Sequence, residues 1–167
     1  MAELENLKQY LSEAEPLVNK ELRTGFSGNT FDGLFEEGEV PEFLYRLLPN
    51  EYVEIDNQSI YCDAAYLSCT KSADYFLSHV SGGHIACLKI KLTSPINRIV
   101  VNELVADAND EGEYILPRNM KLYCKCNQTF SGIVQLEQFA KQEDLYVSGK
   151  ELELIGIHSI TLYELYN

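Results

Sequence analysis

In this chain of 167 residues, three sites in the sequence combine polar side chains with an apolar run, and the first of them is Arg46. It lies inside the apolar run 43–48, which predicts a short buried strand. A guanidinium carries a permanent charge and a planar fork of donors that suits a phosphate or a carboxylate. An arginine on a strand can also extend its charged head to solvent, so both interpretations of Arg46 stay open.

The second group is Ser68-Cys69-Thr70, which leads towards a predicted helix. Helix capping alone can account for Thr70, because a threonine hydroxyl accepts a hydrogen bond from the first turn. It accounts less well for Ser68, which precedes the expected helix by several residues and lies in a segment with the pattern of a strand.

The third group lies in the acidic stretch 107–117, which runs directly into an apolar strand. If Glu111 and Glu113 are extended, one intervening residue places both carboxylates on the same face. Paired carboxylates occur where an enzyme stabilises an oxocarbenium-like transition state. An acidic stretch is often only a solvated turn, so this one alone does not indicate a function. The order of the three motifs along the chain is more informative.

In the order Arg, Ser-x-Thr, Glu-x-Glu, the three groups resemble the mono-ADP-ribosyltransferases of the arginine–serine–glutamate class. The resemblance covers about residues 43–122. Its most specific part is the stretch 111–117, where Glu-x-Glu is followed by an apolar strand and a proline. Residues 44–46 resemble the arginine strand of the family, and residues 68–70 resemble its Ser-Thr-Ser motif.

The resemblance implies an enzyme that splits NAD, releases nicotinamide and transfers ADP-ribose to a protein side chain. It implies that Arg46 holds the phosphates and ribose of NAD, and that Ser68 orients the catalytic glutamate. Thr70 belongs to the same NAD-binding motif. Glu113 corresponds to the glutamate that bonds the ribose hydroxyl and stabilises the cation. Glu111 is implied to select an arginine as acceptor, since a second carboxylate can bind a guanidinium and help to remove its proton.

Three features depart from the family pattern, and the mildest is Cys69-Thr70 in place of Thr-Ser, since the first serine is kept. Leu47 stands where the family has glycine, although its backbone can still contact the nicotinamide carboxamide. The segment 80–84 lacks the aromatic residue and the arginine that toxin relatives carry between helix and strand. His84 could replace that arginine as a cofactor contact, or it could be a strand-edge histidine without a catalytic role.

Two alternatives to a transferase remain open at this stage. One keeps the NAD site but uses water as the acceptor, which makes the protein an NAD glycohydrolase. The other is a non-catalytic acidic domain that binds or inhibits a basic partner. The presence together of Arg46, Ser68, Glu111 and Glu113 favours catalysis, because a binding module needs no such set.

The net charge of −13 comes from 26 acidic and 13 basic residues. It predicts a protein partner with a basic surface and no direct binding of nucleic acid, although the same charge also serves solubility. The sequence predicts no membrane span, no metal, and a cytoplasmic location in the producing cell or in a target cell. The five cysteines predict free thiols, with Cys124 and Cys126 both turned towards the core.

The hydrophobic pattern predicts one domain over residues 1–167, with a helical and loop part at 1–40 and the sheet core at 41–167. Leu4, Leu7 and Leu11 have helical spacing, and a second helix can follow Pro16. The remaining segments are predicted as a loop at 25–40, helices at 70–82 and 136–141, turns at 95–97 and 117–119, and strands at 43–48, 84–92, 98–105, 114–116, 121–126 and 152–165. This order is typical of an α+β fold in which N-terminal helices pack on two mainly antiparallel sheets, and the resemblance implies the ADP-ribosyltransferase form of it.

Overall fold

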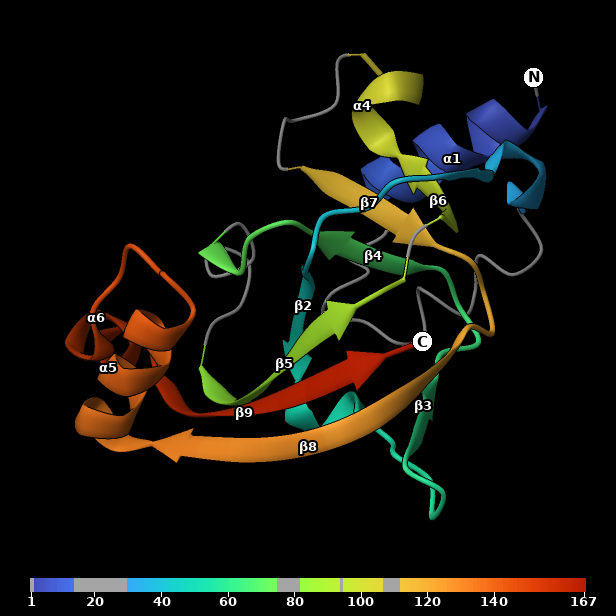
Figure 1. Cartoon of the computed structure of the whole chain (residues 1–167). Helices are drawn as coiled ribbons and strands as arrows, with labels where there is room; N and C mark the ends of the chain where they lie inside the picture. Colours follow the sequence, from blue (N-terminus) through green and yellow to red (C-terminus); the bar gives the residue numbers. More distant parts are fainter. Residues whose placement is uncertain (1, 14–29, 75–81, 94, 107–111) are drawn as a thin grey trace.

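The computed structural model describes residues 2–13, 30–74, 82–93, 95–106 and 112–167 (Figure 1). The strands are β1 (Glu36–Gly38), β2 (Leu44–Pro49), β3 (Ile60–Cys62), β4 (Leu67–Thr70), β5 (Gly83–Lys91), β6 (Ile96–Val100), β7 (Glu113–Leu116), β8 (Lys121–Ser131) and β9 (Ile157–Tyr166). The helices are α1 (Ala2–Glu13), α4 (Val101–Leu104), α5 (Gly132–Gln142) and α6 (Gly149–Leu154), with 3-10 turns η2 (Asp32–Leu34) and η3 (Asn50–Tyr52).

Within the described residues, the strands form one nine-stranded sheet in the order β1-β6-β7-β4-β2-β5-β9-β8-β3. Neighbouring strands are antiparallel, except that β5 and β9 run parallel. In that part of the chain β2 pairs with β5 from Leu44 to Pro49, whereas it pairs with β4 at Tyr45↔Thr70 alone. The sheet therefore divides into two halves at the β2–β4 seam.

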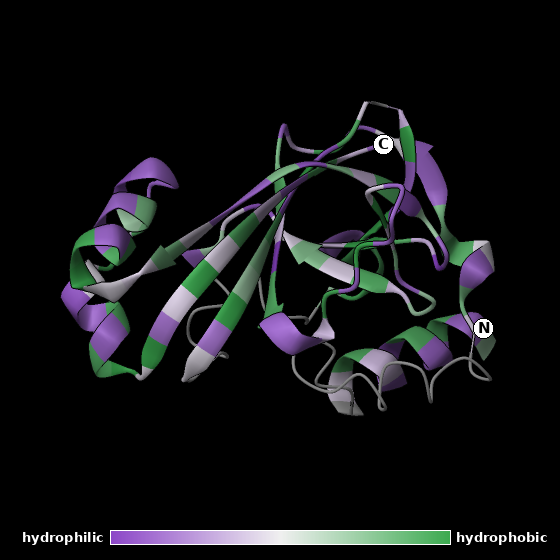
Figure 2. Ribbon diagram, turned by 90° about the horizontal axis from the view of Figure 1, so that it is seen from below, coloured by the Kyte–Doolittle hydropathy of each residue, from purple (hydrophilic) through white to green (hydrophobic). Residues whose placement is uncertain are grey.

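Three apolar clusters hold the halves and the helices together. The α5–α6 pair covers β2, β5, β8 and β9 through residues such as Leu136 and Phe139. A second cluster includes Leu88 of β5 and Leu116 of β7 and joins the two half-sheets. α1 packs through Leu7 in a third cluster with Tyr66, Ile99 of β6 and Ile115 of β7. Figure 2 shows α1 and the α5–α6 pair at opposite ends of the molecule.

The predicted α+β class with an N-terminal helix and a mainly antiparallel sheet is confirmed, with the two expected sheets joined at one register pair. The strand at 43–48 and the helix at 136–141 are confirmed with small shifts of their ends. The second N-terminal helix and most of the helix at 70–82 fall outside the described residues.

Several described segments differ from the predictions. Strand is found at residues 36–38, 60–62, 96–97 and 127–131, and helix at residues 101–104 and 149–154. The α6 helix begins at Ser148, whose hydroxyl accepts a hydrogen bond from the N–H of Glu151. This Ser-x-x-Glu arrangement is an N-terminal helix signal. The apolar spacing of Leu152, Leu154 and Ile155 fits a helix turn as well as a strand, which explains the wrong prediction.

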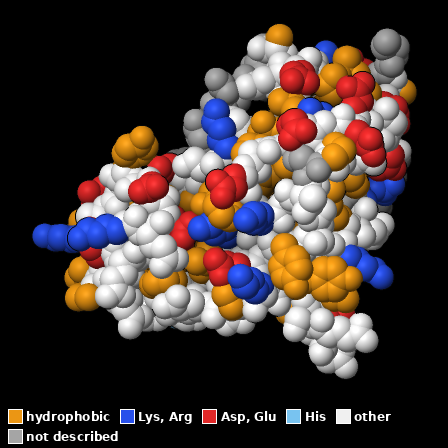
Figure 3. Space-filling view, viewed as in Figure 1, with side chains coloured by type: hydrophobic (Ala, Val, Ile, Leu, Met, Phe, Trp, Pro, Cys, Tyr) orange, Lys and Arg blue, Asp and Glu red, His pale blue; other side chains and the backbone are white. Residues whose placement is uncertain are grey.

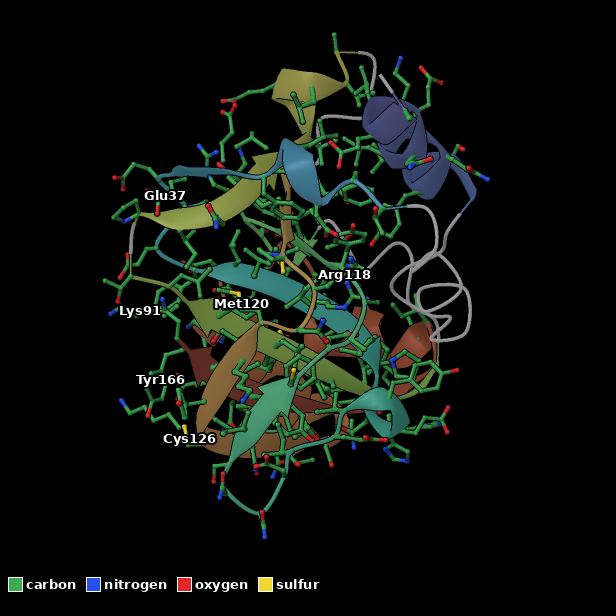
Figure 4. The ribbon with its side chains drawn as sticks, turned by 90° about the vertical axis from the view of Figure 1, so that its right-hand side faces the viewer. Glu37, Lys91, Arg118, Met120, Cys126 and Tyr166 are labelled. Atoms are coloured by element: carbon green, nitrogen blue, oxygen red, sulfur yellow. The ribbon has the colours of Figure 1, made fainter. Side chains whose placement is uncertain are left out.

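All five cysteines lie within the described residues, and each is a free thiol, as predicted. The prediction that Cys124 and Cys126 both turn inwards is wrong, because Cys126 is exposed at the edge of the molecule (Figure 4). A register shift between the two residues interrupts the alternation of the strand. Among the described helices, none has the length and apolar character that crossing a membrane requires.

Candidate functional site

The polar groups singled out in the sequence lie on three neighbouring strands, β2, β4 and β7. One row of the sheet joins Tyr45 to Thr70 and Thr70 to Glu113. Arg46 follows Tyr45 on β2, and Ser68 lies two residues before Thr70 on β4. The fold thus brings five of the predicted residues, Leu47 included, within two positions of one row. Because side chains alternate along β2, that of Arg46 lies on the opposite face from that of Tyr45. Glu111 lies outside the described residues.

Arg46 is fully buried, with 0% of its surface exposed. Its Nη1 donates a hydrogen bond of 2.8 Å to the backbone carbonyl oxygen of Ser68, 22 residues away. The interpretation of Arg46 as a side chain that extends to solvent is therefore wrong. Burying a guanidinium is costly unless hydrogen bonds compensate, and here the side chain bonds the neighbouring strand where the β2–β4 ladder ends.

Ser68 is held through its side chain as well as through its carbonyl. Its Oγ lies 2.7 Å from the hydroxyl oxygen of Tyr10 in α1, and both residues are buried. Sequence reasoning did not single out Tyr10. Its place three residues after Leu7 indicates the apolar face of α1, but no local signal indicates a partner 58 residues away.

Glu113 begins β7, is partly exposed and directly follows Gly112. Gly112 has φ +61°, a left-handed conformation that favours glycine, and a Cβ there would lie 2.7 Å from Cε of Lys71. Ser68 pairs with Ile115, two residues after Glu113. Because side chains alternate along a strand, the side chains of Ser68, Thr70 and Glu113 share one face of the β4–β7 pair.

The buried thiol of Cys69 lies between Ser68 and Thr70 and responds to both charged members of the site. Burial raises its pKa to about 12, with Arg46 acting to lower it and Glu113 acting to raise it. The thiol is therefore protonated at neutral pH and is unsuited to act as a nucleophile.

Leu47 and His84, the other two predicted contacts, are placed differently. The side chain of Leu47 is buried in the cluster beneath α5, so its backbone alone could contact a ligand. His84 is exposed at the start of β5, four residues before Leu88, the register partner of Arg46. Four residues span about 13 Å of extended strand. The Nδ1 of His84 lies 2.6 Å from the hydroxyl of Ser159, so the structure does not bring His84 beside Arg46.

The same row continues from Tyr45 across β5, β9 and β8 into a second polar cluster, which the sequence did not predict. The Tyr45 hydroxyl donates to Oε1 of Glu143 at 3.0 Å, and Nζ of Lys89 lies 2.9 Å from the same oxygen. Burial and the Glu143 carboxylate raise the pKa of Tyr45, which keeps it a donor. A pocket of about 330 Å³ beside the cluster is lined by Lys89, Cys126, Gln128, Gln142, Leu162 and Glu164.

Charge is unevenly spread over the surface. Acidic side chains gather at the end formed by α1, β1 and α4, whereas lysines and acidic side chains are mixed over β5, β8 and β9 (Figure 3). Within the described ranges, no three His, Cys, Asp or Glu side chains lie close enough together to hold a metal ion.

No family model matches the sequence, and none of the curated proteins is similar to it. Solved structures are similar in fold. C3stau2 from S. aureus, whose crystal structure contains NAD, has a TM-score of 0.58 at 13% identity, over 99% of this chain and 87% of that one. An ADP-ribosyltransferase from Clostridium botulinum has a TM-score of 0.53 at 13% identity, over 99% and 87% of the two chains. Plx2a, an ADP-ribosyltransferase toxin from Paenibacillus larvae, has a TM-score of 0.53 at 14% identity, over 98% and 84%. The chain therefore has the ADP-ribosyltransferase fold, as the sequence resemblance implies.

Proposed function

We propose that this chain, which has the ADP-ribosyltransferase fold, is a mono-ADP-ribosyltransferase that binds NAD, releases nicotinamide and passes ADP-ribose to a protein side chain. The observation that carries the proposal is the placement of Arg46, Ser68 and Glu113 on three adjacent strands, with the guanidinium of Arg46 bonded to the carbonyl of Ser68 at the β2–β4 seam. A buried cation, a hydroxyl and a carboxylate together suit a substrate with phosphates and ribose hydroxyls.

Arg46 is proposed to bind the phosphates and ribose of NAD. A guanidinium has five N–H donors, so the bond from Nη1 to Ser68 is compatible with further bonds to a phosphate. Because Arg46 is fully buried, the proposal requires neighbouring segments to move before NAD reaches it. The backbone of Leu47 and the side chain of Thr70 complete the proposed contacts on β2 and β4. His84 is left out because of its distance along β5.

Glu113 is proposed to stabilise the positive charge that develops on the ribose. When the bond between nicotinamide and ribose breaks, its electron pair leaves with nicotinamide, and the ribose ring becomes cationic. A carboxylate beside the ring stabilises that cation and accepts a hydrogen bond from a ribose hydroxyl. The acceptor then forms a bond to the ribose carbon and gives up a proton.

We propose an arginine as the acceptor, with Glu111 as the residue that selects it. Glu111 lies two residues before Glu113 and is separated from it by Gly112, whose left-handed conformation interrupts the strand alternation. The proposal for Glu111 therefore rests on its closeness to Glu113 in the sequence and on the resemblance to the family motif. A carboxylate binds a guanidinium through two hydrogen bonds and can accept its proton during attack. The net charge of −13 suits an acceptor protein with a basic surface.

The proposal is tested by incubating the chain with labelled NAD and a whole-cell lysate, and by measuring both labelled protein and free nicotinamide. Glu113→Gln keeps the size of the side chain and removes its charge. It is expected to lower both signals by about 100-fold or more without changing the melting temperature. Glu111→Gln should reduce labelling more than nicotinamide release. Glu103→Gln, a change at an exposed residue of α4, is the control and should leave both signals unchanged.

Each other outcome has a definite meaning. Full activity of Glu113→Gln would contradict the assignment of the site. Nicotinamide release without a labelled protein would identify a glycohydrolase. If the wild-type chain gives neither signal, the proposed function is wrong and a non-catalytic acidic domain becomes the better account.

A further inference from the structure

Tyr10 connects α1 to the strand that carries the serine of the site. Its ring packs edge-on against Phe31 and Tyr66, with centroid distances of 5.5 and 6.0 Å. The residue has 0% of its surface exposed, so the ring is fixed on all sides. This packing holds the hydroxyl 2.7 Å from Oγ of Ser68. The contact is therefore set by the core of the protein.

The direction of this hydrogen bond decides what Ser68 can do. Each hydroxyl has one proton to donate, and either atom of the Tyr10–Ser68 pair could be the donor. If Ser68 donates to Tyr10, it cannot donate to a carboxylate. If Tyr10 donates, the proton of Ser68 remains available on the face that Ser68 shares with Glu113. A phenol is the more acidic partner, which favours Tyr10 as donor.

We infer that Tyr10 is a positioning residue that donates its hydroxyl proton to Oγ of Ser68 and so directs the proton of Ser68 towards the carboxylate of Glu113. This inference rests on the proposed function, in which Glu113 stabilises the ribose cation. Tyr10 acts through Ser68 and has no contact with substrate in this account. Together with the bond from Arg46 to its carbonyl, the contact fixes Ser68 at two atoms.

Tyr66 is a matched control for a role that is only structural. It belongs to the same aromatic cluster and is also buried. Its hydroxyl donates to Oδ1 of Asp32 at 2.8 Å and accepts from the N–H of Phe31 at 2.9 Å. Tyr66→Phe removes two hydrogen bonds from the same aromatic core, so it is a stringent control for loss of structure. Of the two hydroxyls, that of Tyr10 is the one bonded to Ser68.

The test measures nicotinamide release by the full chain for the wild type, Tyr10→Phe, Ser68→Ala, the double variant and Tyr66→Phe. Tyr10→Phe keeps the ring and its packing, and rates are normalised to the folded fraction from thermal melts. It should lower kcat by about tenfold and leave KM for NAD within about twofold. Ser68→Ala should lower kcat further. The double variant should match Ser68→Ala, because Tyr10 then has nothing to position.

Tyr66→Phe should lower the melting temperature, because the N–H of Phe31 loses its acceptor, and should keep kcat within about twofold of wild type. The inference is overturned if the effects of Tyr10→Phe and Ser68→Ala on kcat multiply in the double variant. It is also overturned if Tyr66→Phe lowers kcat as much as Tyr10→Phe. A wild-type chain without NAD cleavage would instead refute the proposed function, which separates the two failures.

Discussion

The two edges of β2 are built differently. Towards β5, the register runs without interruption from Leu44↔Ile90 to Pro49↔Ile85. Towards β4, the ladder of the described strands consists of Tyr45↔Thr70, and beyond it the side chain of Arg46 reaches the carbonyl of Ser68. One edge is closed by backbone hydrogen bonds, whereas a charged side chain bridges the other. The closed edge holds the sheet together, whereas the open edge carries the residues of the proposed site.

The largest effect is expected from Arg46→Met, which removes the charge at the open edge and keeps much of the side-chain length. If Arg46 binds NAD, cleavage should fall by about 100-fold or more. The carbonyl of Ser68 loses its donor in the buried seam, so the free energy of unfolding should fall by about 1–3 kcal/mol. Nicotinamide release and urea unfolding measure the two effects. Activity within tenfold of wild type would contradict the role of the open edge.

Leu88→Ala tests the closed edge at the register partner of Arg46. Leu88 is fully buried, so the substitution leaves a cavity and should lower the free energy of unfolding by about 2–5 kcal/mol. KM for NAD should stay unchanged at a temperature where the variant is folded. Urea unfolding and steady-state kinetics provide the measurements. A rise in KM comparable to that of an Arg46 variant would remove the distinction between the two edges.

The smallest effect on the protein is expected at Cys126 on β8, which belongs to the half-sheet on the β5 side of β2. A hydrogen bond from the thiol to Glu164 is the main cause that raises the pKa of Cys126. A raised pKa means less thiolate at pH 8 and slower alkylation by iodoacetamide. Glu164→Gln removes the carboxylate, so the pKa should fall and alkylation at pH 8 should become about three- to tenfold faster.

Mass spectrometry of the alkylated peptides separates Cys126 from Cys62, an exposed thiol on β3 that serves as the internal control. The whole pH profile of Cys126 alkylation should move to lower pH in the variant, while that of Cys62 stays in place. An unchanged rate at Cys126 would show that Glu164 does not control this thiol.

Local patterns predicted those parts of the molecule that depend on neighbouring residues. The apolar run around Arg46 predicted β2, and the residues after Glu113 predicted β7 and the turn that follows it. The resemblance of residues 68–70 and 111–117 to one family implied that Ser68 and Glu113 belong to one site, and the β4–β7 register places them on one face. Each of these patterns extends over only a few consecutive residues, so it can be recognised from the sequence alone.

Contacts between distant residues had no such signal. Neither the bond from Arg46 to Ser68 nor that from Tyr10 to Ser68 follows from a local pattern, since the partners lie 22 and 58 residues apart. The pairing of Tyr45 with Glu143 spans 98 residues. At Cys126, one extra residue in the strand was enough to reverse the predicted direction of a side chain.

The position of β9 has a consequence for how the protein folds. β9 follows every other described strand in sequence, yet it lies inside the sheet between β5 and β8 (Figure 1). Its Ser159 meets His84 across 75 residues of chain. Until residues 157–166 insert, both neighbours have an open edge, and open strand edges pair readily with other chains. Contacts between such distant segments form slowly, so insertion of β9 should limit the folding rate and end the period in which the chain is most prone to aggregate.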